Sequence, residues 1–353
     1  MPPHTSTITE INQKRLKEHL EKAELEPLAR EAEKGLGAEN HSQDTSNSAH
    51  DRGTFNPAQN LAMARPVVVI NKASGSTSDI TDVLKHVFMS KVGVSPVVRF
   101  VSPEVVEQTM KEAIGAGANL LVTYGGDGTS RTGADLAKEH DIPFIPLPGG
   151  TMNLLPLAIY GSDNWEEVLS LALSQKEPRW LPAGEVNGHT FYVGAILGET
   201  TRFSEVREKV RDHDIVGAAQ KAVESISNIR GADPIKFQVA PSTEEHEADA
   251  IVLTCPGMRG RRGKQHALEI ASIEPESARD VASLGLNALW SNWRDDESAK
   301  IMQADTFFIP ATETVEALLD GESCPLDGPV IGKLQSKGVK ILAPKISEND
   351  RED

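Results

Sequence analysis

Short apolar runs alternate with amphipathic stretches from residue 66 to about residue 175. The runs have the length and composition of buried strands, and they lie at 67–70, 97–101, 120–124 and 142–147. Stretches with helical spacing follow them at 77–89, 103–114, 129–139, 152–159 and 165–173. The second of these has Ser102 as a predicted N-cap and Pro103 at its first position. Strands separated by helical crossovers predict an α/β domain, with a parallel sheet and helices on both of its faces.

After residue 180 the pattern changes to strands that follow one another with few helical intervals. Asn187-Gly188, within 185–193, predicts a hairpin because these two residues tolerate the positive φ angles of a tight turn. One long helix is predicted at 203–228. Further strands are predicted at 235–240, 250–255, 268–273, 306–309, 313–319 and 339–342. Consecutive strands of this kind predict a second, mainly antiparallel and β-sandwich-like domain.

The predicted organisation has four parts. Residues 1–64 form an N-terminal extension, 65–180 the α/β domain, 181–345 the β-rich domain, and 346–353 an acidic tail. An alternative is that the last segment of the β-rich domain belongs to the α/β domain. Within the extension, 8–34 predicts a charged amphipathic helix and 35–60 a flexible linker rich in Ser, Asn, Asp and Gly. Either the helix is solvated on its tether, or it packs on a partner, on lipid or on the catalytic body.

Charge and composition exclude some functions. A net charge of −16 argues against nucleic-acid binding, which requires clustered Lys and Arg. One basic segment, 259–264, is a candidate for contact with a lipid surface or with phosphate, and a solvated loop is the competing interpretation. Cys255 and Cys324 are too few for a disulfide framework. No apolar run approaches ~20 residues, so we expect a soluble, cytoplasmic protein with at most peripheral membrane contact.

Three glycines follow the apolar run 120–124 almost at once. Gly125, Gly126 and Gly128 allow a sharp turn that brings backbone N–H groups close to an anion, and Thr129 begins a predicted helix whose N-terminus favours negative charge. The carboxylate of Asp127 suits such a phosphate site if a divalent cation or a transferring hydroxyl lies between them. A plain turn, in which Asp127 accepts local N–H groups, is the competing interpretation.

Two more glycine turns follow predicted strands of the same sheet. The segment 71–76 adds the hydroxyls of Ser74 and Ser76 to its backbone N–H groups, and 148–153 opens another helix. Each turn alone is compatible with ordinary loop chemistry. Ligands of parallel sheets bind beyond the carboxyl ends of the strands, so three such turns together predict a phosphate site.

Four segments together resemble the catalytic domain of the diacylglycerol and sphingosine lipid kinase family, most closely its soluble bacterial members. They are 71–75, 125–129, 150–153 and 319–322, and the resemblance spans about 66–344. Gly-Gly-Asp-Gly by itself is shared with NAD kinases and phosphofructokinases; Gly-Thr-x-Asn and the late Asp-Gly-Glu make the match more specific. The resemblance implies two domains with ATP and Mg²⁺ bound in the cleft between them. It implies ATP-dependent phosphoryl transfer to a lipid hydroxyl, foremost that of diacylglycerol or a related lipid.

The same resemblance assigns roles to single residues. It implies that Asp127 lies near the metal and the phosphates and that Glu322 is the general base that takes the proton of the acceptor hydroxyl. Without the resemblance, a solvated glutamate in a hairpin is the competing interpretation of Glu322. The residues implied to hold the nucleotide are Asn71, Ser74, Gly75, Ser76, Gly125, Gly126, Gly128, Thr129, Gly150, Thr151 and Asn153.

The chain also departs from the family pattern. Bacterial relatives carry an Asp-Asp-Gly-like segment that binds a structural Mg²⁺, and 266–280 lacks it. Four acids of this stretch are candidate substitutes, but no spacing selects among Glu269, Glu274, Glu276 and Asp280. Two other functions are kept as alternatives: a kinase of a soluble acceptor, such as a nucleotide or a sugar, and a non-catalytic nucleotide-binding regulator. A homodimer is also left open.

Overall fold

The computed structural model describes residues 65–74, 80–198, 234–248, 250–258, 267–273 and 299–345. All of them belong to one unit, which runs from Phe55 to Asp353. The predicted helices at 8–34 and 203–228, the basic segment 259–264 and the acidic tail lie outside the described residues.

Parallel strands form one half of a ten-stranded sheet, in the order β2-β1-β3-β4. The strands are β1 (Pro66–Asn71), β2 (Val97–Val101), β3 (Leu120–Gly125) and β4 (Phe144–Pro148). Every residue of β3 and β4 is buried, as expected for strands that are covered on both faces. The predicted parallel sheet is therefore confirmed.

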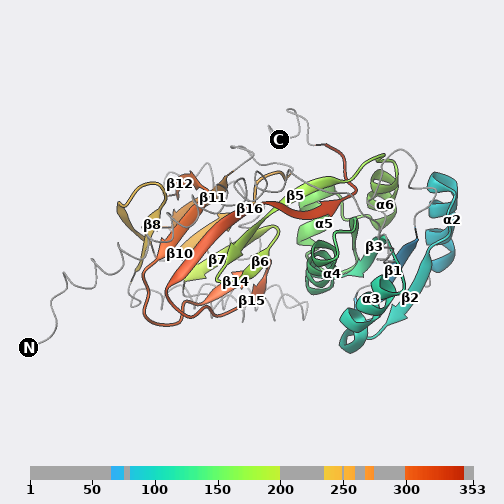
Figure 1. Cartoon of the computed structure of the whole chain (residues 1–353), viewed down its shortest axis with the longest axis horizontal. Coiled ribbons are helices and arrows are strands. Elements are labelled where there is room, and N and C mark those ends of the chain that lie inside the picture. The colour runs from blue at the N-terminus through green and yellow to red at the C-terminus, as the bar shows by residue number, and fades with distance from the viewer. Residues whose placement is uncertain are drawn as a thin grey trace, which may run out of the picture. The chain divides into compact units, whose positions relative to one another are not determined.

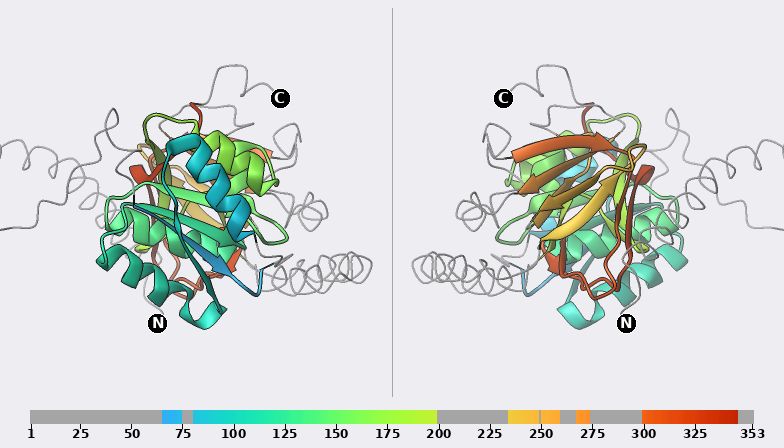
Figure 2. Two further views of the ribbon diagram at one scale, coloured as in Figure 1. Left: turned by 90° about the vertical axis from the view of Figure 1, so that its right-hand side faces the viewer. Right: turned by 90° about the vertical axis from the view of Figure 1, so that its left-hand side faces the viewer.

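Helices cover both faces of these strands. On one face α2 packs against α6, and on the other α3 packs against α4 (Figure 2). The helices are α2 (Thr81–Val92), η1 (Pro103–Val105), α3 (Val106–Gly115), α4 (Asp127–Glu139), α5 (Leu154–Tyr160) and α6 (Trp165–Leu173). Among the described residues, no helix is long and apolar enough to cross a lipid bilayer.

Four predicted helix starts were wrong in detail. The helix predicted from residue 77 begins at Thr81. The helix predicted from Thr129 begins at Asp127, so this acid lies in the first helical turn. The next helix begins at Leu154 because Asn153 adopts a left-handed conformation, with φ of 53°, that a helix cannot include. Ser102 does occupy the N-cap position, but of the 3-10 turn η1, and its side chain makes no capping hydrogen bond.

Strand β16 (Val330–Ile341) joins the parallel strands to antiparallel ones in the same sheet (Figure 1). Its first half pairs with β13 on one side and β5 on the other, and Ile341 then pairs in parallel with Phe144 of β4. The strand begins at Val330, well before the predicted start at 339. Its first half contains Gly332 and several polar residues, which hid the strand from a search for apolar runs.

Antiparallel pairing accounts for the remaining strands. The large sheet adds β5 (Arg179–Val186), β6 (His189–Phe191), β8 (Ile235–Val239), β9 (Glu245–Ala248) and β13 (Thr306–Ile309). A second sheet has the order β12-β11-β10-β7-β14-β15. Its members are β12 (Ala299–Ala304), β11 (Leu268–Ile273), β10 (Ala250–Thr254), β7 (Gly194–Gly198), β14 (Ala317–Leu319) and β15 (Glu322–Ser323). The predicted antiparallel sheet is confirmed, although β7, β9, β12 and β15 were not predicted and the strand expected at 313–319 is limited to β14.

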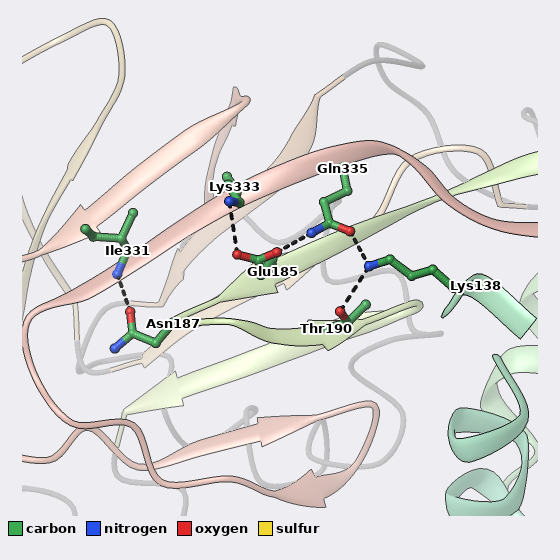
Figure 3. Close-up of polar contacts among 7 residues, drawn as sticks. All are labelled: Lys138, Glu185, Asn187, Thr190, Ile331, Lys333 and Gln335. Atoms are coloured by element: carbon green, nitrogen blue, oxygen red, sulfur yellow. Dashed lines mark hydrogen bonds and ion pairs between the residues drawn. The ribbon is translucent and has the colours of Figure 1, made fainter. Parts of the chain in front are cut away.

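The predicted Asn-Gly hairpin is confirmed in detail. Asn187 and Gly188 form the turn of the β5–β6 hairpin with φ angles of 45° and 86°. The Asn187 side chain also fixes the neighbouring strand, because its Oδ1 accepts a hydrogen bond of 2.9 Å from the backbone N–H of Ile331 (Figure 3). Side chains from both halves, such as Val122 and Phe307, belong to one continuous hydrophobic core.

A buried carboxylate holds the β14–β15 hairpin in place. Asp320 and Gly321 form its turn with φ angles of 49° and 82°. The Asp320 carboxylate accepts hydrogen bonds from three backbone N–H groups, those of Tyr192 at 2.7 Å, Val193 at 2.7 Å and Gly194 at 3.1 Å. Burial raises the pKa of Asp320, and these three donors and the charge of Arg131 oppose that rise. The hairpin is thereby anchored to the start of β7.

The packing at Gly332 predicts that this position tolerates no larger residue. A Cβ on Gly332 would lie 1.7 Å from a ring atom of Phe307, its partner in the ladder. Because Phe307 is buried and cannot move away, we expect Gly332→Ala to lower the free energy of unfolding by about 2 kcal/mol or more, measured by urea denaturation. Gly115→Ala is the control: nothing lies within 4 Å of its added Cβ, and a change beyond about 1 kcal/mol there would be unexpected. Equal losses in both variants would contradict this explanation.

The Asp320 anchor predicts a second stability effect. Asp320→Ala would leave three buried N–H groups without their acceptor, so we expect a loss of about 3 kcal/mol in the free energy of unfolding. Asp320→Asn retains one acceptor oxygen and should lose less. Asp327→Ala, at an exposed position of the same segment, should change the value by no more than about 0.5 kcal/mol. A neutral Asp320→Ala variant would show that the anchor is dispensable.

Candidate active site

The direction of the strand connections changes between β1 and β3. The chain leaves β1 through α2 to reach β2 on one side, and it leaves β3 through α4 to reach β4 on the other. The carboxyl ends of two adjacent strands whose connections diverge form the usual ligand site of a parallel sheet. Segments 71–74 and 125–129 lie at these ends, as predicted from the sequence.

The first two turns are bonded to each other. The side-chain amide of Asn71 donates to the hydroxyl of Thr129 at 3.0 Å, and the N–H of Gly126 donates to the hydroxyl of Ser74 at 3.2 Å. Ser74 and Thr129 are both buried. In this structure their polar groups therefore hold the two turns together. Gly75 and Ser76, which were predicted to continue the first turn, lie outside the described residues.

The third turn touches the second through its backbone. Gly149 N–H donates to the carbonyl of Gly125 at 3.0 Å, and a Cβ on Gly150 would lie 2.5 Å from the Cα of Gly126. Asn153 is buried and closes this turn, because its side chain accepts from Gly150 N–H at 2.7 Å and donates to Gly150 O at 3.0 Å. Thr151 lies exposed at the tip. All three predicted turns thus meet at one edge of the sheet.

Asp127 links the starts of two helices. It lies in the first turn of α4, and its Oδ1 accepts a hydrogen bond of 2.6 Å from the N–H of Leu154, the first residue of α5. Within the described ranges, no group of three or more His, Cys, Asp or Glu is arranged to hold a metal ion. Mg²⁺ usually takes only one or two carboxylates from a protein and completes its shell with water and substrate phosphates, and Asp127 fits that requirement.

Glu322 comes to this site from the opposite end of the sequence. It is the first residue of β15, just after the Asp320-Gly321 turn. Its Oε1 lies 3.6 Å from the position that a Cβ on Gly128 would take. The half-buried carboxylate of Glu322 is therefore next to the glycine turn that also contains Asp127.

Some residues of the site were not singled out in the sequence. Arg131 Nη1 donates to the carbonyl of Leu319 at 3.2 Å, and the hydroxyl of Tyr192 donates to Asp135 at 2.8 Å. Burial raises the pKa of Tyr192, so this phenol stays protonated and keeps donating. Arg131 and Asp135 lie four residues apart on one helix, and this spacing could have pointed to them in the sequence. Such pairs are usually solvated, however, so the signal is weak.

Of the four candidate substitutes for the structural Mg²⁺ site, the structure describes only Glu269. Glu269 is buried in β11, where it accepts a hydrogen bond of 3.3 Å from the hydroxyl of Thr254 on the neighbouring strand. Glu274, Glu276 and Asp280 lie outside the described residues.

Comparison with known proteins finds one family model and several solved structures that are similar to this chain. Residues 65–186 match the model of the diacylglycerol kinase catalytic domain. No curated protein matches the chain. Among solved structures, a diacylglycerol kinase from Bacillus anthracis strain Sterne is 14% identical, with a TM-score of 0.57 over 79% of this chain and 97% of its own. A protein assigned as a diacylglycerol kinase from the same strain is 16% identical, with a TM-score of 0.61 and the same coverage.

At these identities the solved structures establish a shared fold, and the family model identifies the domain that contains the glycine turns. Over residues 65–186 the chain is similar to the diacylglycerol kinase catalytic domain.

Proposed function

We propose that the protein is an ATP-dependent kinase that transfers a phosphoryl group to a lipid hydroxyl, foremost that of diacylglycerol or a related lipid. The observation that carries this proposal is the position of the Glu322 carboxylate beside Gly128. The Gly125–Thr129 turn, which we propose to bind phosphate, and the Glu322 carboxylate from a distant hairpin therefore lie side by side. Phosphoryl transfer to an alcohol requires such a pair of groups. The family of residues 65–186 supports a lipid as the acceptor.

The turns around β1, β3 and β4 suit the phosphates of ATP. Gly126 and Gly150 carry no side chain at their point of contact, so the second and third turns can lie directly against each other beside the first turn of α4. The first turn of α4 has N–H groups without acceptors inside the helix, and its dipole favours an anion there. The hydrogen bonds from Asn71 to Thr129 and from Gly126 to Ser74 hold this surface in shape before the nucleotide arrives.

Asp127 is the residue that we expect to hold Mg²⁺, together with phosphate oxygens of the nucleotide. When bound, Mg²⁺ neutralises charge on the phosphates and so favours their attack by an oxygen nucleophile. The hydrogen bond between Asp127 and Leu154 fixes the carboxylate at the mouth of the glycine turn.

Glu322 is proposed to act as the general base. Its carboxylate takes the proton of the acceptor hydroxyl while that oxygen forms a bond to the γ-phosphorus. The bond between the γ-phosphorus and the bridging oxygen breaks, and ADP leaves with the electron pair. Positioning and electrostatic stabilisation supply most of the rate, so the place of Glu322 matters as much as its basicity.

The proposal is tested by incubating the purified protein with labelled ATP, Mg²⁺ and a panel of lipids in mixed micelles, beside soluble nucleotides and sugars. We expect label in a lipid product, and we expect Glu322→Gln to lower kcat by about 10²- to 10⁴-fold while ATP still binds. Glu313→Gln, an exposed acid of the same segment, is the matched control and should retain activity. Label in a soluble acceptor alone would replace the lipid assignment, and ATP binding without any turnover would favour a regulator.

Asp127→Asn separates the proposed charge requirement from the structural role. An asparagine Oδ1 can still accept the Leu154 N–H, so we expect unchanged folding by circular dichroism. We also expect kcat to fall by at least about 100-fold with a higher Mg²⁺ requirement, because the negative charge is lost. Removal of divalent ions with EDTA should abolish turnover by the unchanged protein. A folded Asp127→Asn variant with full activity at ordinary Mg²⁺ would remove the metal role, and Asp163→Asn, at an exposed position, is the control.

A further inference from the structure

One face of α4 makes polar contacts with the antiparallel half of the structure. Arg131, Asp135 and Lys138 follow Gly128 at intervals of three or four residues, which places all four positions on one side of the helix. Lys138 Nζ donates to Thr190 at 3.3 Å and to Gln335, which in turn donates to Glu185 (Figure 3). Asp135 accepts from Tyr192, and Arg131 donates to the carbonyl of Leu319. Helix α4, whose first turn is part of the proposed nucleotide site, is thus bonded to β6, β14 and β16.

Arg131 differs from Asp135 and Lys138 because its side chain bonds to the hairpin that carries Glu322. Its acceptor, Leu319, is the last residue of β14 and the direct ladder partner of Glu322. Burial raises the pKa of Asp320, the acid of the turn between Leu319 and Glu322, and the backbone N–H donors and then the charge of Arg131 oppose that rise. Arg131 therefore acts on the strand end before the turn and on the turn itself.

The β14–β15 ladder joins Glu322 directly to Leu319. β15 contains only Glu322 and Ser323, and it pairs with β14 at the edge of the six-stranded sheet. A displacement of Leu319 would therefore move its partner Glu322. Gly128, which lies next to the Glu322 carboxylate, is one helical turn before Arg131 on the same face. One turn of α4, from Gly128 to Arg131, thus contacts both the Glu322 carboxylate and the strand that pairs with Glu322.

We propose that Arg131 is a positioning residue that sets the distance between the Glu322 carboxylate and the Gly125–Thr129 turn. This role rests on the function proposed above, with Glu322 as the base. Arg131 acts through the Leu319 carbonyl and Asp320. Its effect should appear in the rate of transfer, because the turns that we expect to bind ATP do not include it.

The experiment compares steady-state kinetics of the full chain and five variants: Arg131→Met, Arg131→Lys, Lys138→Met, Glu322→Gln and the double variant Arg131→Met/Glu322→Gln. We expect Arg131→Met to lower kcat by about 10- to 100-fold, because small misplacements of catalytic groups cost rates of this order. The KM for ATP should stay within about twofold. Arg131→Lys retains the charge and one donor and should recover part of the rate. Lys138→Met removes a cation from the same helix face two turns away from the hairpin, and its kcat should stay within about twofold of the unchanged protein.

The double variant decides whether Arg131 acts through Glu322. If it does, adding Arg131→Met to Glu322→Gln lowers kcat no further, since the group that it positions is already lost. Multiplied losses in the double variant, a rise in the KM for ATP equal to the loss in kcat, or the same loss from Lys138→Met would each overturn the positioning role. If Arg131→Met does not fold, the same cycle is run with Arg131→Lys. An unchanged rate in Glu322→Gln would refute the proposed base itself, which is a distinct outcome.

Discussion

Backbone contact between two glycine turns is the constraint on which the site depends. A Cβ on Gly150 would lie 2.5 Å from the Cα of Gly126, and the N–H of Gly149 bonds to the carbonyl of Gly125. Only glycine allows two backbone segments to approach each other this closely. The contact brings the turns that follow β3 and β4 together on one surface, and the bonds from segment 71–74 add the turn that follows β1. Everything proposed for the nucleotide follows from that surface.

The second requirement is that an acid from the antiparallel half stays beside this surface. Strand β16 makes both halves parts of one sheet, because it pairs with β5, β13 and β4. The polar face of α4 adds contacts to Leu319, Tyr192 and Gln335. A shared sheet, one continuous core and a polar helix face leave little freedom for the hairpin of Glu322 to move away from Gly128.

Many elements could be predicted because their signals are local. The apolar runs of β1, β2 and β3 and the positive φ angles of Asn187-Gly188 depend on neighbouring residues alone. Elements whose stability comes from distant partners were missed or misplaced. The polar first half of β16 is a strand because it is paired on both sides, and Asn153 ends the third turn because its side chain closes on Gly150.

The sequence by itself determined the fold class, the three glycine turns at one sheet edge, and the candidate residues Asp127 and Glu322. The fold class and the glycine turns with Asp127 follow from residue type and from short-range order, since glycine, strand and helix signals act over a few positions. Glu322 is a candidate only because the sequence resembles the lipid kinase family. Only the tertiary structure decided that Glu322 lies beside Gly128, that Asp127 holds the start of α5, and that Arg131 bonds to the strand end before the hairpin. Such contacts join residues far apart in the chain, and they exist only after strand pairing has brought the two halves together.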